Sequence, residues 1–361
     1  MAIKVGIVGA GSMASYHYDG FLSAGAETAA IADQDTKRAE AFTKTRPVER
    51  IFTSLGEMLK GCPELDAVSV VTPNKFHKPL TLEALGAGKH VFCEKPPALN
   101  AAEMEEMLAA SKKAGKTLMF DFNNRARPES RAMIRYITEG AVGKINSAQA
   151  AWIRRAGIPG FGGWFTNKAL SGGGPVIDLP HMLDLALYFM GYPKPAWCLA
   201  GVFYDFMNNK AFKGPWGIPD AANGITDVES ACHGMITFTT GQVLMIRCSW
   251  AEFVERELVR VSFQGTKAGG KVERLFGIDG VDATSIDNCS LYTEEYGVQV
   301  NRNIVTEKDD TMGRVGQAAN FIGVITGKEK ALNTADEALI LMKLVDALYE
   351  SAAQGKPVQM T

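Results

Sequence analysis

Two segments of the chain contain residues that could move a proton and a hydride at a hydroxyl group. The first is Glu94-Lys95-Pro96, which directly follows a short apolar run over residues 91–93. Proline fixes its own φ and restricts the residue before it, so Lys95 is held close to the end of a predicted strand. The Lys95–Pro96 bond is a candidate cis peptide. A solvated Glu-Lys pair in a loop is the alternative, and the neighbouring motifs argue against it.

The second segment is S-G-G-G-P-V-I-D-L-P-H-M-L-D over residues 171–184. Asp178 is predicted to be the N-cap of a helix that runs to Met190. His181 follows three residues later, so the two side chains are expected on one face of the first turn. The helix dipole favours a neutral imidazole there, which suits a general base. A simple cap for Asp178 and a structural histidine are the alternatives.

A glycine-rich turn follows the first predicted strand, in the sequence G-A-G-S-M-A. Gly9 permits a tight turn, and Gly11 lets the backbone approach a pyrophosphate, while Ala14 replaces a third glycine. Ser12 and Met13 begin the next helix, whose first N–H groups would face phosphates. The strand before the motif and the helix after it give it the context of a dinucleotide site.

The second predicted strand, over residues 28–32, ends in Asp33. A carboxylate at this position accepts hydrogen bonds from the adenosine ribose and repels a 2′-phosphate, which favours NAD. Lys37 and Arg38 are suitable partners for a 2′-phosphate, so NADP stays open. Asp35 fits the cap of the following helix better than Asp33 does.

Strands and helices alternate as far as residue 122, which predicts a doubly wound parallel sheet. In such sheets ligands bind outside the carboxyl ends of the strands. The T-P-N sequence after the strand over residues 67–71 lies at that edge, as does E-K-P. One cofactor along the edge would touch Thr72, Asn74, His77, Glu94 and Lys95.

The pattern changes after residue 124, which predicts domains over residues 1–124 and 125–361. Strand-like runs dominate the second domain and are joined by few helices. They cover residues 145–154, 197–206, 232–239, 243–251, 258–263 and 290–298. We expect a mostly antiparallel sheet with one face covered by helices and one open face. An open face of this size is typical of an oligomer interface or a substrate wall.

Composition excludes several classes of protein. Apolar residues make up 46% and charged residues 22% of the chain, and the formal net charge is −2. This balance gives no electrostatic basis for binding nucleic acid or an anionic membrane surface. No apolar run is long enough to span a bilayer, and no signal peptide pattern is found, so a cytoplasmic location is expected. The six scattered cysteines predict neither disulfides nor a metal site.

Taken together, these motifs resemble the glucose–fructose oxidoreductase / inositol dehydrogenase / MocA (Gfo/Idh/MocA) family over nearly the whole chain. The resemblance rests on G-A-G-S-M-A, T-P-N-K-F-H, A-G-K-H-V-F-C-E-K-P, F-N-N-R, G-G-G-P-V-I-D-L-P-H-M-L-D and A-L-Y-E-S-A-A-Q-G-K-P-V. It implies an N-terminal Rossmann domain that binds NAD(P) and a C-terminal α/β domain with an open sheet. It also implies oxidation or reduction of a sugar, a polyol or a related hydroxy compound.

The resemblance assigns roles to individual residues. Lys95 and His181 correspond to the polar catalytic pair, with Asp178 beside them. The residues implied at the nicotinamide end are Thr72, Asn74, His77 and Glu94. The family usually places four steps between the aspartate and the histidine, whereas this chain has three.

We therefore expect hydride transfer between nicotinamide and a secondary alcohol or carbonyl. His181 would take the hydroxyl proton, Asp178 would orient it or hold a neighbouring hydroxyl, and Lys95 would stabilise charge on the oxygen. A substrate wall is expected from Trp152, Arg154, Arg155, Trp164 and Phe165. The open sheet would join a homo-dimer or homo-tetramer. NAD-assisted glycoside cleavage and a non-catalytic, cofactor-binding regulator are the alternatives.

Overall fold

The structure is a computed structural model that describes residues 2–276 and 285–360. The chain divides into two compact units. Unit 1 comprises the residues up to Arg127 together with Asp309–Met342, and unit 2 comprises Pro128–Lys308 and the residues from Lys343 onward. The predicted fold class, a parallel doubly wound sheet followed by a mostly antiparallel sheet, is confirmed.

Unit 1 contains a parallel six-stranded sheet in the order β3-β2-β1-β4-β5-β6. The strands are β1 Lys4–Val8, β2 Glu27–Ala32, β3 Arg50–Phe52, β4 Ala67–Val70, β5 His90–Cys93 and β6 Leu118–Phe120. The central strands are buried, as helices on both faces of a parallel sheet require. This strand order places the switch point between β1 and β4, where doubly wound folds bind their ligands.

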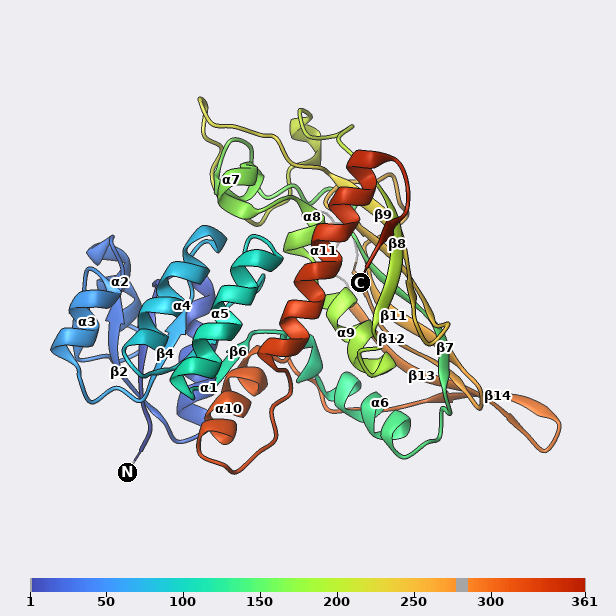
Figure 1. Ribbon diagram of the computed structural model, residues 1–361, viewed down its shortest axis with the longest axis horizontal. Coiled ribbons are helices and arrows are strands. Elements are labelled where there is room, and N and C mark those ends of the chain that lie inside the picture. The colour runs from blue at the N-terminus through green and yellow to red at the C-terminus, as the bar shows by residue number, and fades with distance from the viewer. Residues whose placement is uncertain (1, 277–284, 361) are drawn as a thin grey trace. The chain divides into compact units, whose positions relative to one another are not determined.

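Side-chain caps begin three helices of unit 1. The Asp35 carboxylate accepts from the Lys37 N–H, Ser54 caps with Glu57, and Asn100 accepts from the next helix. The helices are α1 Ser12–Ser23, α2 Thr36–Thr43, α3 Leu55–Gly61, α4 His77–Gly86 and α5 Ala101–Ala114 (Figure 1). Short 3₁₀ turns follow β4 at Asn74–Phe76 and β6 at Asn123–Arg125.

A helix from the C-terminal part of the sequence completes unit 1. Helix α10, Arg314–Ile325, packs against α1, where the small Gly20 lets Ala318 approach closely (Figure 1). Phe321 joins Phe21 and Phe92 in one hydrophobic core. The predicted boundary between residues 124 and 125 assigned this whole segment to the second domain. The contacts place Asp309–Met342 in unit 1 because α10 covers apolar surface on α1 and β5.

Unit 2 contains a nine-stranded sheet, counted over the described residues, in the order β14-β13-β12-β11-β7-β10-β9-β8-β15. All neighbouring strands are antiparallel except β7 and β10. The strands are β7 Ile145–Ile153, β8 Pro195–Phe203, β9 Ala231–Phe238, β10 Val243–Ser249, β11 Leu258–Gly265, β12 Gly269–Phe276, β13 Ser285–Glu295, β14 Val298–Asn303 and β15 Val358–Gln359.

Helices cover one face of this sheet. They are α6 Pro128–Thr138, α8 Pro175–Asp178, α9 His181–Met190 and the later part of α11 Ala335–Gln354 (Figure 1). A fifth helix, α7 Lys168–Ser171, precedes α8. Thr334 and Glu337 form the predicted capping box of α11. No helix in the described ranges is both long and apolar enough to cross a membrane.

The opposite face of the sheet exposes an apolar row across three strands. Leu199 on β8 pairs with Met235 on β9, which pairs with Met245 on β10. Leu199 and Met245 are exposed, while the alternate residues of β10 are buried beneath the helices. The predicted open face is therefore present, with apolar side chains at its centre.

Candidate active site

The glycine turn after β1 has the geometry of an anion site. Gly9 has φ of 98°, and a Cβ there would lie 2.2 Å from the Val71 carbonyl oxygen, so a side chain is excluded. Gly11 occupies the N-cap of α1 with extended backbone, and no atom lies within 4 Å of the position of a Cβ. The first N–H groups of α1, from Ser12 and Met13 onward, are thus approachable by a phosphate.

Asp33 lies directly after β2 and holds this turn in place. One carboxylate oxygen accepts from the Ala10 N–H at 2.8 Å, and the other accepts from the Asp35 N–H at 2.8 Å. Asp33 is half-buried, and each oxygen keeps a second lone pair that a ribose hydroxyl can use. The turn and Asp33 together fit the pyrophosphate and adenosine ribose of a dinucleotide.

His77 joins the loops that follow β4 and β5. Its Nε2 lies 2.8 Å from the Thr72 carbonyl oxygen, and its Nδ1 lies 2.7 Å from the Pro96 carbonyl oxygen. The ring is fully buried, and this burial lowers the pKa of His77. Asn74, in the same loop, is also buried. The His77 side chain thus holds two backbone segments together, and the predicted place of both residues at the nicotinamide end stays a prediction.

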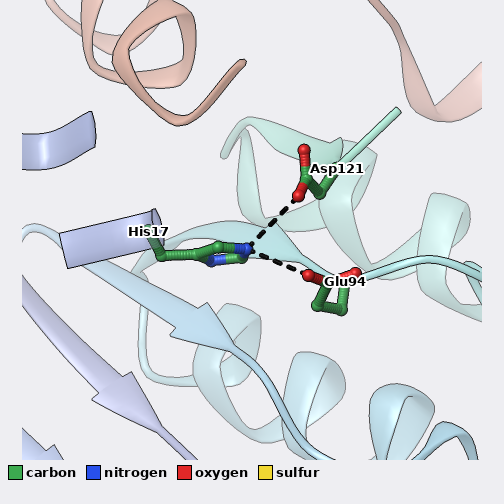
Figure 2. Close-up of side chains that lie close together, drawn as sticks. All are labelled: His17, Glu94 and Asp121. Carbon is green, nitrogen blue, oxygen red and sulfur yellow. Dashed lines mark ion pairs between the residues drawn. The ribbon is translucent and has the colours of Figure 1, made fainter. Parts of the chain in front are cut away.

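Lys95 is half-buried and precedes a cis peptide bond, the isomer for which its sequence made it a candidate. Its backbone N–H donates to the carboxylate of Glu94 at 3.0 Å. The other oxygen of Glu94 lies 3.3 Å from Nε2 of His17 on α1, and Oδ2 of Asp121 lies 3.6 Å from the same nitrogen (Figure 2). The carboxylate of Glu94 therefore contacts other groups of the protein, the Lys95 N–H and the His17 ring.

Burial and neighbouring charges have opposite effects on the pKa values of His17 and Glu94. Burial alone would lower the pKa of His17, but Asp121 and Glu94 outweigh it and raise that pKa to about 9. Burial would raise the pKa of Glu94, yet His17 and then Lys95 lower it to about 2. Burial raises the pKa of Asp121 above its usual value. No role was expected for His17 from the sequence, and the missed signal is a histidine on the helix that directly follows a glycine turn.

The Asp178–His181 segment differs from its prediction. Asp178 is the last residue of α8 and His181 the first of α9, so Asp178 is not the N-cap of a helix that runs to Met190. Pro180 explains the break, because proline lacks an N–H and disfavours helix at the residue before it. His181 does lie in a first helical turn. Asp178 accepts a hydrogen bond from Nε1 of the buried Trp250 at 2.9 Å.

Below α8, a buried carboxylate holds the glycine segment. Glu229 accepts from the Gly174 N–H with both oxygens at 3.1 Å, from the Val176 N–H at 3.2 Å and from the Tyr349 hydroxyl at 2.8 Å. Burial raises the pKa of Glu229. A Cβ on Gly173 would lie 2.0 Å from the Tyr349 hydroxyl oxygen, so the close packing requires glycine. The G-G-G-P motif is thus explained by this anchor.

The Trp152 ring lies beside His181 and links it to further aromatic residues. The Trp152 ring lies 5.5 Å from the His181 ring, between centroids. The Arg154 guanidinium lies 5.8 Å from the Trp152 ring and 4.4 Å from the ring of Trp216. Asp184, which the sequence left open as a surface carboxylate, is fully buried and accepts from a tyrosine hydroxyl.

The predicted substrate wall continues from Trp216. Phe165 meets Trp216 edge to face at 6.0 Å between centroids, and Trp164 stacks on Phe165 at 3.7 Å. Arg154 and Trp164 therefore belong to one aromatic cluster, and their role in binding a substrate stays a prediction. Sequence reasoning did not single out Trp216, which lies in a long connection whose path no local pattern predicts.

Comparison with known proteins decides the family. Residues 3–122 match the "Oxidoreductase family, NAD-binding Rossmann fold", and residues 134–360 match the "Oxidoreductase family, C-terminal alpha/beta domain" of Gfo/Idh/MocA proteins. The chain belongs to the Gfo/Idh/MocA oxidoreductase family. This confirms the family resemblance, the NAD-binding Rossmann domain and the assignment as an oxidoreductase.

Individual relatives extend the family assignment over the whole chain. The D-glucoside 3-dehydrogenase of Escherichia coli K12 is 33% identical over 362 residues, which cover 99% of this chain and 97% of that protein. A putative UDP-kanosamine synthase oxidoreductase subunit of Amycolatopsis mediterranei is 30% identical over 70% of this chain and 69% of that protein. A levoglucosan dehydrogenase solved with NADH shares the fold, with a TM-score of 0.84 at 20% identity over 100% of both chains.

Proposed function

We propose that this protein is an NAD-dependent dehydrogenase that oxidises a ring hydroxyl of a glucoside or a closely similar sugar. The observation that carries the proposal is the end-to-end similarity to D-glucoside 3-dehydrogenase, in a chain that has both Lys95 and His181. NAD is favoured over NADP because the Asp33 carboxylate stands where it would repel a 2′-phosphate.

When bound, NAD supplies a hydride acceptor. On this proposal, Gly9, Gly11, Ser12 and Met13 contact the pyrophosphate through backbone, and Asp33 accepts from the adenosine ribose. Thr72, Asn74, His77, Glu94 and Lys95 line the nicotinamide end. Of these, His77 and Glu94 act through the backbone they hold, because their side chains are buried against protein groups.

Three residues are assigned to proton transfer, substrate orientation and charge stabilisation. A ring nitrogen of His181 takes the proton from the substrate hydroxyl, and the first turn of α9 favours the neutral imidazole that this requires. Asp178, fixed by Trp250, orients the substrate hydroxyls. Nζ of Lys95 stabilises the charge that develops on the same oxygen. The aromatic cluster with Arg154 and Trp164 binds the apolar face of the sugar.

We further propose a homo-dimer or homo-tetramer through the open face of the sheet in unit 2, in the cytoplasm. The apolar row of Leu199, Met235 and Met245 supports this, because exposed apolar side chains in register across strands favour a second copy of the same surface. Met245→Glu is expected to lower the mass measured by light scattering, with Lys113→Glu, an exposed position on α5, as control.

The function is tested with purified protein, NAD⁺ or NADP⁺, and a panel of methyl glucosides, levoglucosan and inositol. We expect NADH absorbance with a glucoside, a ketone at one ring carbon by NMR, and a preference for NAD⁺. Lys95→Met should lower kcat roughly 10²–10³-fold, while the exposed Lys113→Met should not. Release of the aglycone without net NADH would favour glycoside cleavage. NAD binding without turnover of any substrate would favour a regulator.

A further inference from the structure

His17 occupies a position that the proposed chemistry does not use. It lies on α1, in the turn after Ser12 and Met13, and its side chain is fully buried. Its Nδ1 lies 2.7 Å from the Ser69 hydroxyl on β4, and its Nε2 points between Glu94 and Asp121 (Figure 2). One imidazole therefore connects the helix behind the glycine turn with the ends of three strands.

We propose that His17 is a positioning residue: as an imidazolium it holds the Glu94 carboxylate against the Lys95 backbone N–H and so couples the pyrophosphate-binding helix to the Lys95 loop. This inference rests on the proposed function for the role of Lys95. It assigns His17 no contact with substrate or cofactor.

The protonated ring follows from the partners of its two nitrogens. Nε2 has two carboxylates at 3.3 and 3.6 Å, and neither anion can donate to it unless it is protonated itself. Two buried carboxylates this close to one nitrogen are stabilised by a positive charge between them. A proton on Nε2 supplies that charge, and the Nδ1 proton then goes to Ser69.

The helix that carries His17 is coupled to the Lys95 loop through the segment Lys95-Pro96, which is held at both of its ends. Glu94 accepts from the Lys95 N–H, and His77 bonds the carbonyl of Pro96. The segment from the Lys95 N–H to the Pro96 carbonyl is thus fixed by two buried side chains, Glu94 and His77. Loss of the His17 charge would release Glu94 and with it one of these two contacts.

A divalent cation is the competing occupant of the cluster. The ligand atoms of His17, Glu94 and Asp121 lie within 4.8 Å of one another. Three protein ligands leave at least one coordination position to be filled by water, which needs an entry path. All three side chains are buried, with exposures of 0%, 7% and 2%, so the geometry favours a proton over a metal ion.

The first experiment measures the proton itself, without any activity. Histidine ¹⁵N spectra of the wild-type protein are compared with those of His17→Gln to assign the ring. We expect both nitrogens of His17 to stay protonated at pH 8. The other groups that act on the cluster are Glu94 and Asp121 directly, Arg314 through Asp121, and Lys95 and His77 through Glu94. A neutral His17 ring at pH 7 would overturn the proposal, as would a stoichiometric metal ion in the purified protein.

The second experiment measures the position of Lys95. Exchange of the Lys95 amide hydrogen should be about tenfold faster in His17→Gln. The control is His90→Gln, at the other end of β5, which should leave it unchanged. If His17→Gln does not fold, Ser69→Ala removes only the Nδ1 partner and should accelerate the exchange less. Unchanged exchange in the folded variant would overturn the proposal, whether or not the protein is a dehydrogenase.

The third experiment applies once a substrate is known. His17→Gln should lower kcat roughly 10- to 100-fold with a smaller change in KM for NAD⁺, because Lys95 is misplaced while the glycine turn is retained. Glu94→Gln should act through the same contact, so the double variant should be no worse than the worse single variant. Additive losses would show that His17 acts independently of Glu94.

Discussion

Units 1 and 2 each hold a functional segment with a buried glutamate, but the two glutamates are neutralised in different ways. Glu94 fixes the Lys95 loop and is compensated by the charged ring of His17. Glu229 fixes the start of α8 and, in the described part of the chain, accepts from neutral donors: the Gly174 and Val176 N–H groups and the Tyr349 hydroxyl. The anchor at Glu94 is an ion pair, and the anchor at Glu229 is a set of hydrogen bonds from uncharged groups.

The pKa directions follow from that difference. The charge of His17 more than offsets burial, so the pKa of Glu94 falls to about 2. For Glu229 burial outweighs its hydrogen bonds, and its pKa rises. A full opposite charge thus overcomes desolvation where several neutral donors do not. The stabilisation at Glu94 therefore depends on one strong ion pair and is lost with its partner. The stabilisation at Glu229 is the sum of several weaker hydrogen bonds.

Removal of one charge from the ion pair should have the largest effect. Glu94→Gln is expected to lower the free energy of unfolding by about 3 kcal/mol, the lower end for breaking a buried ion pair, because Asp121 remains near His17. Urea unfolding at pH 7 measures this. The matched variant Glu229→Gln keeps a carbonyl oxygen for the neutral donors and should cost less. Equal losses in the two variants would remove the distinction between the anchors.

The same distinction predicts a loss of stability at alkaline pH. The pKa of His17 is raised from 6.5 to about 9, so its contribution is present below pH 6.5 and is lost as pH rises to 9. The loss should be on the order of 2–3 kcal/mol, and it should be absent in His17→Gln. Burial raises the pKa of Glu229, so this group should instead favour the folded state as pH falls through that pKa. Denaturant midpoints at pH 6, 8 and 10 measure the alkaline loss, and a further series at successively lower pH measures the trend from Glu229.

Much of unit 1 was predictable because its signals are local. Asp35, Ser54 and Asn100 cap helices where the sequence places them, and the parallel sheet follows from alternating apolar strands. The loops that hold Asp33, Thr72 and Glu94 follow the ends of β2, β4 and β5 for the same reason, and the catalytic role of these loops stays a prediction. The sequence alone also predicted that position 9 requires glycine, because a tight turn of this kind leaves no room for a side chain.

The failures come from contacts between distant residues. His17 meets its partners only after β4, β5 and β6 are assembled, so no periodicity reveals it. The break at Pro180 was visible in the sequence, and the prediction of one helix through it was wrong for a local reason.

Loss of one neutral donor tests the second anchor. Tyr349→Phe removes the hydroxyl that donates to Glu229 and should cost about 2 kcal/mol, as for a hydrogen bond to a charged group. The remaining backbone donors to Glu229 should keep α8 in place, so the protein should still fold. Thermal unfolding measures the loss, with Tyr296→Phe, which is fully exposed, as control. A loss as large as that of Glu94→Gln would mean that the anchor at Glu229 depends on this single bond.

The smallest effect is expected at the second carboxylate of the ion-pair cluster. Asp121 has a raised pKa, and its Oδ1 is buried without a hydrogen-bond partner among the described residues. Its charge is therefore poorly compensated, and Asp121→Asn should change the free energy of unfolding at pH 7 by less than about 1 kcal/mol. Because one negative charge beside His17 is lost, the pKa of His17 should fall towards 6.5, and the alkaline loss of stability should begin at lower pH. A large destabilisation together with loss of the alkaline limb would show that Asp121, and not Glu94, is the main partner of His17.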